Sequence, residues 1–160
     1  MGDAPREGER LLPFDPGARA DASLCFIGHI RSPWGPDTDT PKNIGRARET
    51  GQPAQIELAE GFGAGLAGLS VGQPIIVITW MHLGRRDLIV QAPRHADGPR
   101  GTFALRSPRR PNPVAMSTVR ITSIDPEAGV IGIDATDAFD GTPVVDIKPW
   151  LETVDLPPRE

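Results

Sequence analysis

Short runs of β-branched and other apolar residues, each ended by glycine or proline, recur along this 160-residue chain. The most hydrophobic run covers residues 74–83 and predicts a central strand. Residues 114–124 and 130–135 flank a turn at 125–129 and predict a hairpin. Shorter runs predict further strands at residues 24–31, 54–58 and 88–91. We therefore expect an all-β fold, a small closed or nearly closed β-barrel with one short helix and long functional loops.

The one helix we expect lies at residues 62–69, where Phe62, Leu66 and Leu69 have helical spacing. This stretch also contains the pattern G-x-G-x-x-G, which in dinucleotide-binding proteins precedes a long helix inside a βαβ unit. Here residues 70–74 stop the helix after two turns, and a strand follows directly. We therefore interpret the glycines as packing residues rather than as a dinucleotide fingerprint.

The length suits one domain, and we expect a flexible N-terminal arm at residues 1–22, a barrel domain at 23–155 and a tail at 156–160. No apolar run is long enough for a transmembrane helix, and the first residues have no apolar core typical of a secretory signal. The single cysteine, Cys25, suits a reducing compartment. A cytoplasmic location is the expectation.

The net charge of −4 argues against bulk electrostatic binding of nucleic acid. The arginines are unevenly spread, however, because five of them lie between residues 94 and 110. A local positive patch can therefore exist on an acidic protein, which permits an RNA substrate without requiring one.

Residues 101–113 predict a short apolar strand that runs into a loop dense in arginine and proline. Prolines 108, 111 and 113 fix the backbone and remove hydrogen-bond donors, so the loop is expected to be stiff and extended. Guanidinium groups bind carboxylates and phosphates through two hydrogen bonds at once. We interpret the loop as a binding site rather than as a solvated connector.

An acidic segment at residues 134–143 follows the predicted hairpin, with Asp134, Asp137 and Asp140 spaced three apart. It could be a plain acidic turn. Its carboxylates also suit the vicinal hydroxyls of a ribose or a cationic ligand, because each offers several acceptor positions.

Two long motifs carry a family resemblance, FALRSPRRPNP at residues 103–113 and DGTPVVDIKPW at residues 140–150. Together they resemble the TrmO family, also called TsaA-like or YaeB-like, from about Cys25 to Trp150. The resemblance implies an all-β barrel methyltransferase that uses S-adenosylmethionine. It further implies tRNA as the partner, methylated at N6 of threonylcarbamoyladenosine beside the anticodon, and a homodimer with the cofactor near the subunit interface.

The resemblance carries several cofactor contacts over to this chain: Ile44, Gly45, Arg46, His82, Leu83, Asp134, Ala135, Thr136 and Asp137. Arg106 and Met116 complete the set of donors, acceptors and apolar walls that the cofactor needs. Leu83 can offer only backbone groups. We expect the cationic loop and the acidic segment to face each other with the cofactor between them.

The acceptor nitrogen must lose a proton, and the candidate catalytic residues are Asp137, His82 and Asp140. Expected substrate-binding residues are Arg109, Arg110, Asn112 and Lys148. No metal site is expected, since the three histidines share no ligand spacing. Two alternatives stay open: methylation of another modified nucleoside or a small molecule, and a non-catalytic module that binds S-adenosylmethionine.

Overall fold

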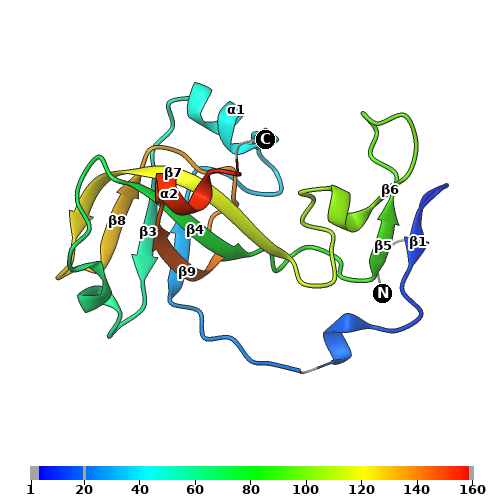
Figure 1. Cartoon of the computed structure of the whole chain (residues 1–160), viewed down its shortest axis with the longest axis horizontal. Coiled ribbons are helices and arrows are strands. Elements are labelled where there is room, and N and C mark those ends of the chain that lie inside the picture. The colour runs from blue at the N-terminus through cyan, green and yellow to red at the C-terminus, as the bar shows by residue number, and fades with distance from the viewer. Residues whose placement is uncertain (1–3, 20, 159–160) are drawn as a thin grey trace. The chain divides into compact units, whose positions relative to one another are not determined.

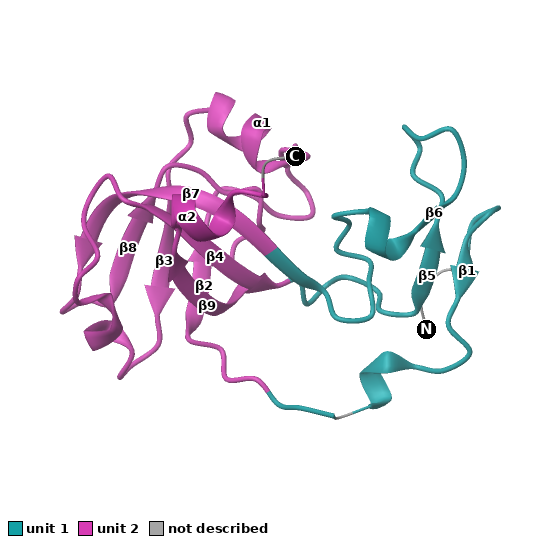
Figure 2. Cartoon of the chain, in the orientation of Figure 1, with its two compact units in different colours: residues 1–23, 81–115 teal, residues 24–80, 116–160 magenta. Residues whose placement is uncertain are grey.

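The computed structural model describes residues 4–19 and 21–158 and divides the chain into two compact units (Figure 2). Unit 1 combines Met1–Ser23 with Met81–Ala115, and unit 2 combines Leu24–Trp80 with Met116–Glu160. Unit 2 contains the long predicted strands, whereas unit 1 contains the arginine- and proline-rich loop. The predicted division into an N-terminal arm, a barrel domain and a tail stays a prediction, because the boundaries of the two units do not coincide with the predicted ones.

Unit 2 is built on a closed ring of six strands, the arrangement of a small barrel (Figure 1). The strands are β2 (Gly28–Arg31), β3 (Ala54–Leu58), β4 (Pro74–Trp80), β7 (Val114–Asp125), β8 (Val130–Ile133) and β9 (Pro143–Pro149). They follow one another around the ring as β2-β3-β8-β7-β4-β9. The predicted hairpin is confirmed, since β7 and β8 pair antiparallel. The predicted strand at 24–31 is shorter than expected, because residues 24–26 are exposed and extend before β2.

Isoleucine fills the interior of the ring, one from nearly every strand. Fully buried side chains are those of Ile30, Ile56, Ile75, Ile121 and Ile131. Buried and exposed residues alternate in β2, so one face of the strand meets the core and the other meets solvent. Each isoleucine contributes roughly 1.5–3 kcal/mol through burial, which makes this core the main source of stability in unit 2.

Helical structure is short but more frequent than the single helix expected, so the fold is mostly β rather than strictly all-β. The helical segments are α1 (Ile44–Glu49), α2 (Glu152–Asp155) and the 3-10 turns η1 (Pro16–Ala18), η2 (Gly63–Leu66) and η3 (Thr102–Ala104). The predicted helix at 62–69 is the single turn η2, with Leu66 buried. Within residues 4–19 and 21–158, no helix is long and apolar enough to cross a bilayer.

Unit 1 contains a three-stranded sheet in the order β1-β5-β6. Its strands are β1 (Arg10–Leu11), β5 (Leu88–Gln91) and β6 (Arg100–Gly101). The strand expected from residue 101 onward is wrong beyond Gly101, because the chain turns into η3 and exposes 79% of Phe103. The N-terminal segment supplies β1, which pairs antiparallel with β5.

The Arg6–Glu9 pair closes a turn within the N-terminal segment, just before β1. The Glu9 side chain is only 2% exposed and accepts hydrogen bonds from the backbone and the guanidinium of Arg6, the shortest at 2.6 Å. These bonds, with a smaller contribution from the backbone of Ala92, lower the pKa of Glu9 to about 2. The folded pKa lies below the unfolded value of 4.5, so the pair contributes stability above that value and loses it as the pH falls through 2.

Replacing Glu9 with glutamine should open the turn before β1 at neutral pH, because the amide cannot form the charge-assisted bonds to Arg6. Amide exchange of Leu11 and Leu12 measures the opening. The wild-type protein should lose this protection as the pH falls from about 4.5 to 2, whereas the Glu9→Gln variant should show little pH dependence there. Glu7→Gln, at an exposed neighbouring carboxylate, is the control. Equal protection in all three proteins would contradict this role of the pair.

Candidate functional site

Helix α1 is tied to the acidic segment by one arginine. The Arg48 Nε donates to Oδ2 of Asp134 at 2.6 Å, and its Nη2 donates to the carbonyl of Thr118 at 3.2 Å. Asp134 follows β8 directly, and Thr118 lies in β7. Arg48 therefore joins α1, β7 and the end of β8 at one corner of unit 2.

Helix α1 begins where it does because Asn43 caps it. The Asn43 side chain accepts a hydrogen bond from the backbone N–H of Arg46 at 2.9 Å. Ala47 is buried, and Ile44 is half-buried against the core. Gly45 and Arg46 are exposed, and Arg46 forms an ion pair with Glu49 at 2.8 Å.

Both carboxylate oxygens of Asp134 accept hydrogen bonds within unit 2. Its Oδ1 accepts from the backbone N–H of Arg120 at 2.8 Å, while Oδ2 accepts from Arg48. This carboxylate therefore links α1 and β7 at the corner. The cofactor contact expected for it stays a prediction.

The residues after Asp134 are held by donors from the loop that follows β2. The indole Nε1 of Trp34 donates to the carbonyl of Thr136 at 2.7 Å, and the Ser32 hydroxyl donates to the carbonyl of Ala138 at 2.8 Å. Ala135 and Thr136 are buried, so their side chains belong to the interior. Asp137 is half-buried between these two anchored carbonyls. Its backbone position is thus fixed on both sides.

Asp140 lies further along the same segment and is exposed. Its Oδ1 accepts from the backbone N–H of Ser32 at 3.2 Å, and its Oδ2 is 3.8 Å from Arg31. Met116, in β7 two residues before Thr118, is 51% exposed. The structure therefore places the α1 residues, Met116 and the segment from Asp134 to Asp140 in one unit.

The loop in unit 1 is held by side-chain donors as well as by proline. Arg86 donates to the carbonyl of Pro111 at 2.6 Å and to Oδ1 of Asn112 at 3.3 Å. Arg110 donates to the carbonyl of Leu105 at 2.9 Å, and Gln91 donates to that of Arg109 at 2.6 Å. Arg110 and Asn112 thus have structural partners.

The remaining predicted residues of unit 1 are exposed. They are His82, Leu83, Arg106 and Arg109. The Arg109 guanidinium makes no hydrogen bond or ion pair with any residue that the structure describes.

Lys148, in β9 of unit 2, forms an ion pair with Asp146 at 2.8 Å, which raises the pKa of the lysine. Arg106 and Asp137 belong to different units, so the expected pairing of the two corners stays a prediction.

Sequence reasoning did not single out Arg48, Trp34, Ser32 or Arg86. Asn43 alone had a readable signal, since asparagine directly before a helical turn is a typical N-cap. The other four act across the fold on residues far away in the chain, so no local pattern indicates them.

If the corner binds S-adenosylmethionine, the cofactor that the sequence resemblance implies, replacing Arg48 with alanine should weaken that binding about tenfold, an order-of-magnitude expectation for loss of one positioning contact. The free energy of unfolding should fall by only about 1 kcal/mol or less, because the ion pair is partly exposed. Calorimetric titration and denaturant unfolding measure the two effects. Arg6→Ala is the matched control, since it removes a similarly exposed arginine with a 2.6 Å ion pair to Glu9, outside the corner. Equal cofactor affinity in both variants would contradict the role of Arg48.

Comparison with known proteins gives a family match over most of the chain. Residues 29–156 match the family model described as the tRNA-methyltransferase O N-terminal domain. Crystal structures of TrmO are similar, and one from Pseudomonas aeruginosa has a TM-score of 0.65 at 28% identity, covering 84% of this chain and 58% of its own.

Relatives from several organisms are similar in sequence. The probable S-adenosyl-L-methionine-binding protein VirR of Rhizobium radiobacter is 35% identical over 129 residues, covering 81% of this chain and 71% of its own. A probable S-adenosyl-L-methionine-binding protein of Archaeoglobus fulgidus is 36% identical over 132 residues, covering 82% of this chain and 35% of its own. The chain thus spans only part of the length of these proteins.

Proposed function

Because the chain belongs to the family of the tRNA-methyltransferase O N-terminal domain, we propose that it is an S-adenosyl-L-methionine-dependent methyltransferase acting on tRNA. The proposed acceptor is the N6 nitrogen of threonylcarbamoyladenosine beside the anticodon, the substrate that the resemblance implies. The observation that carries the proposal is the corner of unit 2 where Arg48 joins α1 to the segment after β8. We further propose a homodimer and a cytoplasmic location.

The residues at this corner have the chemistry that such a cofactor requires. Ile44 and Met116 offer apolar surface, and the carboxylate of Asp137 offers acceptors for hydroxyl or amino groups. The anchored backbone from Ala135 to Ala138 keeps these acceptors in place. S-adenosyl-L-methionine supplies, when bound, a methyl group on a positively charged sulfur.

The work of the protein is to position the acceptor nitrogen and to remove its proton. Methylation would leave the acceptor nitrogen with one proton to release, so a base must lie beside it. Asp137 is our first candidate for the acceptor of that proton, because its backbone is fixed on both sides. His82 and Asp140 are the other candidates.

The charge distribution supports an RNA partner for unit 1. Unit 1 has ten arginines and seven aspartates or glutamates, a net charge of +3, whereas unit 2 has seven basic and fourteen acidic residues, a net charge of −7. Several unit 1 arginines form no ion pair with any described residue: Arg10, Arg19, Arg94, Arg100, Arg109 and Arg110. Guanidinium groups without a carboxylate partner favour binding of phosphates.

One observation favours a second candidate function. The relatives from Rhizobium radiobacter and Archaeoglobus fulgidus are named only for binding S-adenosyl-L-methionine. A module that binds the cofactor without transferring the methyl group is therefore the alternative to catalysis, and a different methyl acceptor is the alternative to threonylcarbamoyladenosine.

Transfer of a tritiated methyl group separates these functions. The protein is incubated with labelled S-adenosyl-L-methionine and two bulk tRNA preparations, one from cells that make threonylcarbamoyladenosine and one from cells that lack it. We expect label only in the first preparation. Label in both preparations would contradict the proposed acceptor, and cofactor binding without transfer to either would favour the binding module.

A further inference from the structure

The N-terminal segment precedes the family match, which begins at residue 29, yet it is part of the cationic unit. It adds β1 to the sheet of unit 1, and the Leu12 N–H donates to the carbonyl of Asp87 at 2.7 Å. Beyond β1 it presents Phe14, which is 40% exposed. The Arg19 guanidinium lies over this ring, 4.0 Å from its centroid.

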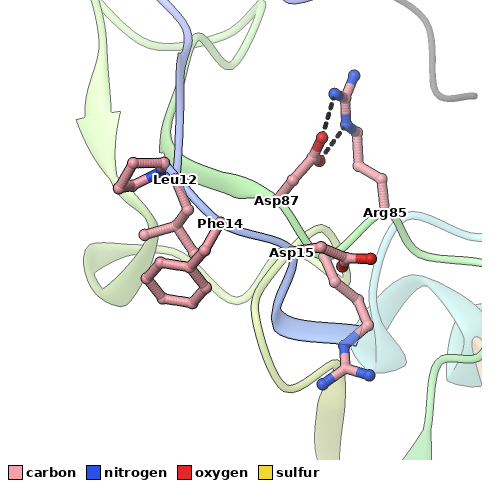
Figure 3. Close-up of a pocket in the computed structure, with 7 residues that line it drawn as sticks. Leu12, Phe14, Asp15, Arg85 and Asp87 are labelled. Carbon is pink, nitrogen blue, oxygen red and sulfur yellow. Dashed lines mark hydrogen bonds and ion pairs between the residues drawn. The ribbon is translucent and has the colours of Figure 1, made fainter. Parts of the chain in front are cut away.

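Phe14 lines a shallow, open surface pocket of about 450 Å³ (Figure 3). One wall comes from the N-terminal segment, with the apolar side chains of Leu12, Pro13 and Phe14 and the carboxylate of Asp15. The other wall comes from residues 85–87. The pocket therefore has an aromatic and aliphatic side and a charged side, both within unit 1.

The two carboxylates of the pocket differ in what they can still accept. Both oxygens of Asp87 accept from Arg85, at 2.7 and 2.8 Å, and this pairing lowers the pKa of Asp87 (Figure 3). Asp15 uses Oδ1 to accept from the backbone N–H of Gly17 at 2.7 Å. Its second oxygen keeps acceptor capacity for a ligand N–H.

We propose that this pocket is an RNA-binding subsite that holds one unstacked base of the substrate. The planar base would contact the face of Phe14 that Arg19 does not cover, since bases stack on aromatic side chains when a strand is single-stranded. An exocyclic amino group, present on adenine, guanine and cytosine, would donate to Asp15. The adjoining phosphates would meet Arg19 and Arg10, both exposed and without an ion pair among the described residues.

An RNA is favoured over a free small molecule because unit 1 contains further arginines that are not among the pocket-lining residues. A separate nucleotide would use the pocket alone, whereas a strand would also meet the other arginines that lack ion pairs in this unit. The inference rests on the proposed function, and it gives the N-terminal segment a role in binding the substrate RNA.

Binding of fluorescently labelled tRNA, followed by anisotropy at fixed salt, tests the subsite. Phe14→Leu keeps an apolar wall but removes the aromatic face, and affinity should fall about 5- to 100-fold. Phe14→Tyr should restore affinity to within about twofold, because the ring is retained. Phe62→Leu is the matched control, since Phe62 lies in unit 2 and is 37% exposed. It should bind tRNA like the wild type.

The contribution of the arginines is measured separately, by the salt dependence of tRNA binding. In the variant that combines Arg10→Ala with Arg19→Ala, the slope of log affinity against log salt should shrink by about 1–2, as expected for two lost phosphate contacts. The proposal is overturned if tRNA binds the Phe14→Leu and Phe62→Leu variants equally well, or if the arginine variant keeps the wild-type slope. Failure of the wild-type protein to methylate tRNA, measured separately, counts against the proposed function instead.

Discussion

Replacing Asp137 with asparagine should reduce the single-turnover rate of methyl transfer by about 100- to 10,000-fold, the range expected for loss of a general base. The amide has the shape of the carboxylate but cannot accept the proton that the nitrogen releases. Affinity for S-adenosyl-L-methionine should change by less than about tenfold, because one acceptor oxygen remains. Rapid-quench transfer of a labelled methyl group measures the rate, and calorimetric titration measures the affinity.

Two comparisons make the Asp137 result specific. Glu127→Gln removes an exposed carboxylate in the turn after β7 and should leave the rate unchanged. His82→Gln and Asp140→Asn, measured in the same way, rank the other candidates for proton acceptor. A transfer rate for Asp137→Asn within about threefold of the wild type would exclude this residue as the base.

Replacing Gly28 with alanine should destabilise unit 2 by about 3 kcal/mol or more, because the added carbon has no room. A Cβ at Gly28 would lie 2.2 Å from the carbonyl oxygen of Glu57 and 2.8 Å from the Cα of Leu58. Both are backbone atoms of β3, so relief requires β2 and β3 to separate. Because β2 pairs with β3 on one side and β9 on the other, their separation would open the ring.

Denaturant unfolding measures the effect of Gly28→Ala, and Gly65→Ala is its matched control. A Cβ at Gly65 meets nothing within 4 Å, so its free energy of unfolding should stay within about 0.5 kcal/mol of the wild type. If both variants unfolded at the same denaturant concentration, the close approach of β2 and β3 would not limit the fold.

Local chemistry made several strands of both units predictable. Strands β3 and β5 have the predicted bounds, since apolar β-branched residues there lie between clear turn signals. The β7–β8 hairpin was readable from its turn, where Gly129 has the positive φ of 68° that favours glycine. The glycine-rich stretch at 63–68 was correctly separated from a dinucleotide fingerprint, because it forms only one 3-10 turn and a connection.

Contacts between residues far apart in the sequence determine the structural features that the sequence analysis missed. Helix α1 lies where no helix was expected, and it is held by the Asn43 cap and by Arg48, whose partner Asp134 is 86 residues away. Trp34 reaches Thr136 across 102 residues. Such pairs depend on how strands align around the ring. The strand expected after Gly101 does not form, and here too the cause is a contact with another strand. The buried Thr102 hydroxyl donates to the carbonyl of Leu88 in β5 and ends the extended run.

We propose that the corner joined by Arg48 in unit 2 binds the cofactor. Titration of ¹⁵N-labelled protein with S-adenosyl-L-methionine, followed by amide chemical shifts, tests it most directly. We predict that the largest shifts will occur at residues 44–48, 116–118 and 134–138. Saturating cofactor that leaves these amides unchanged, while shifting others, would contradict the account.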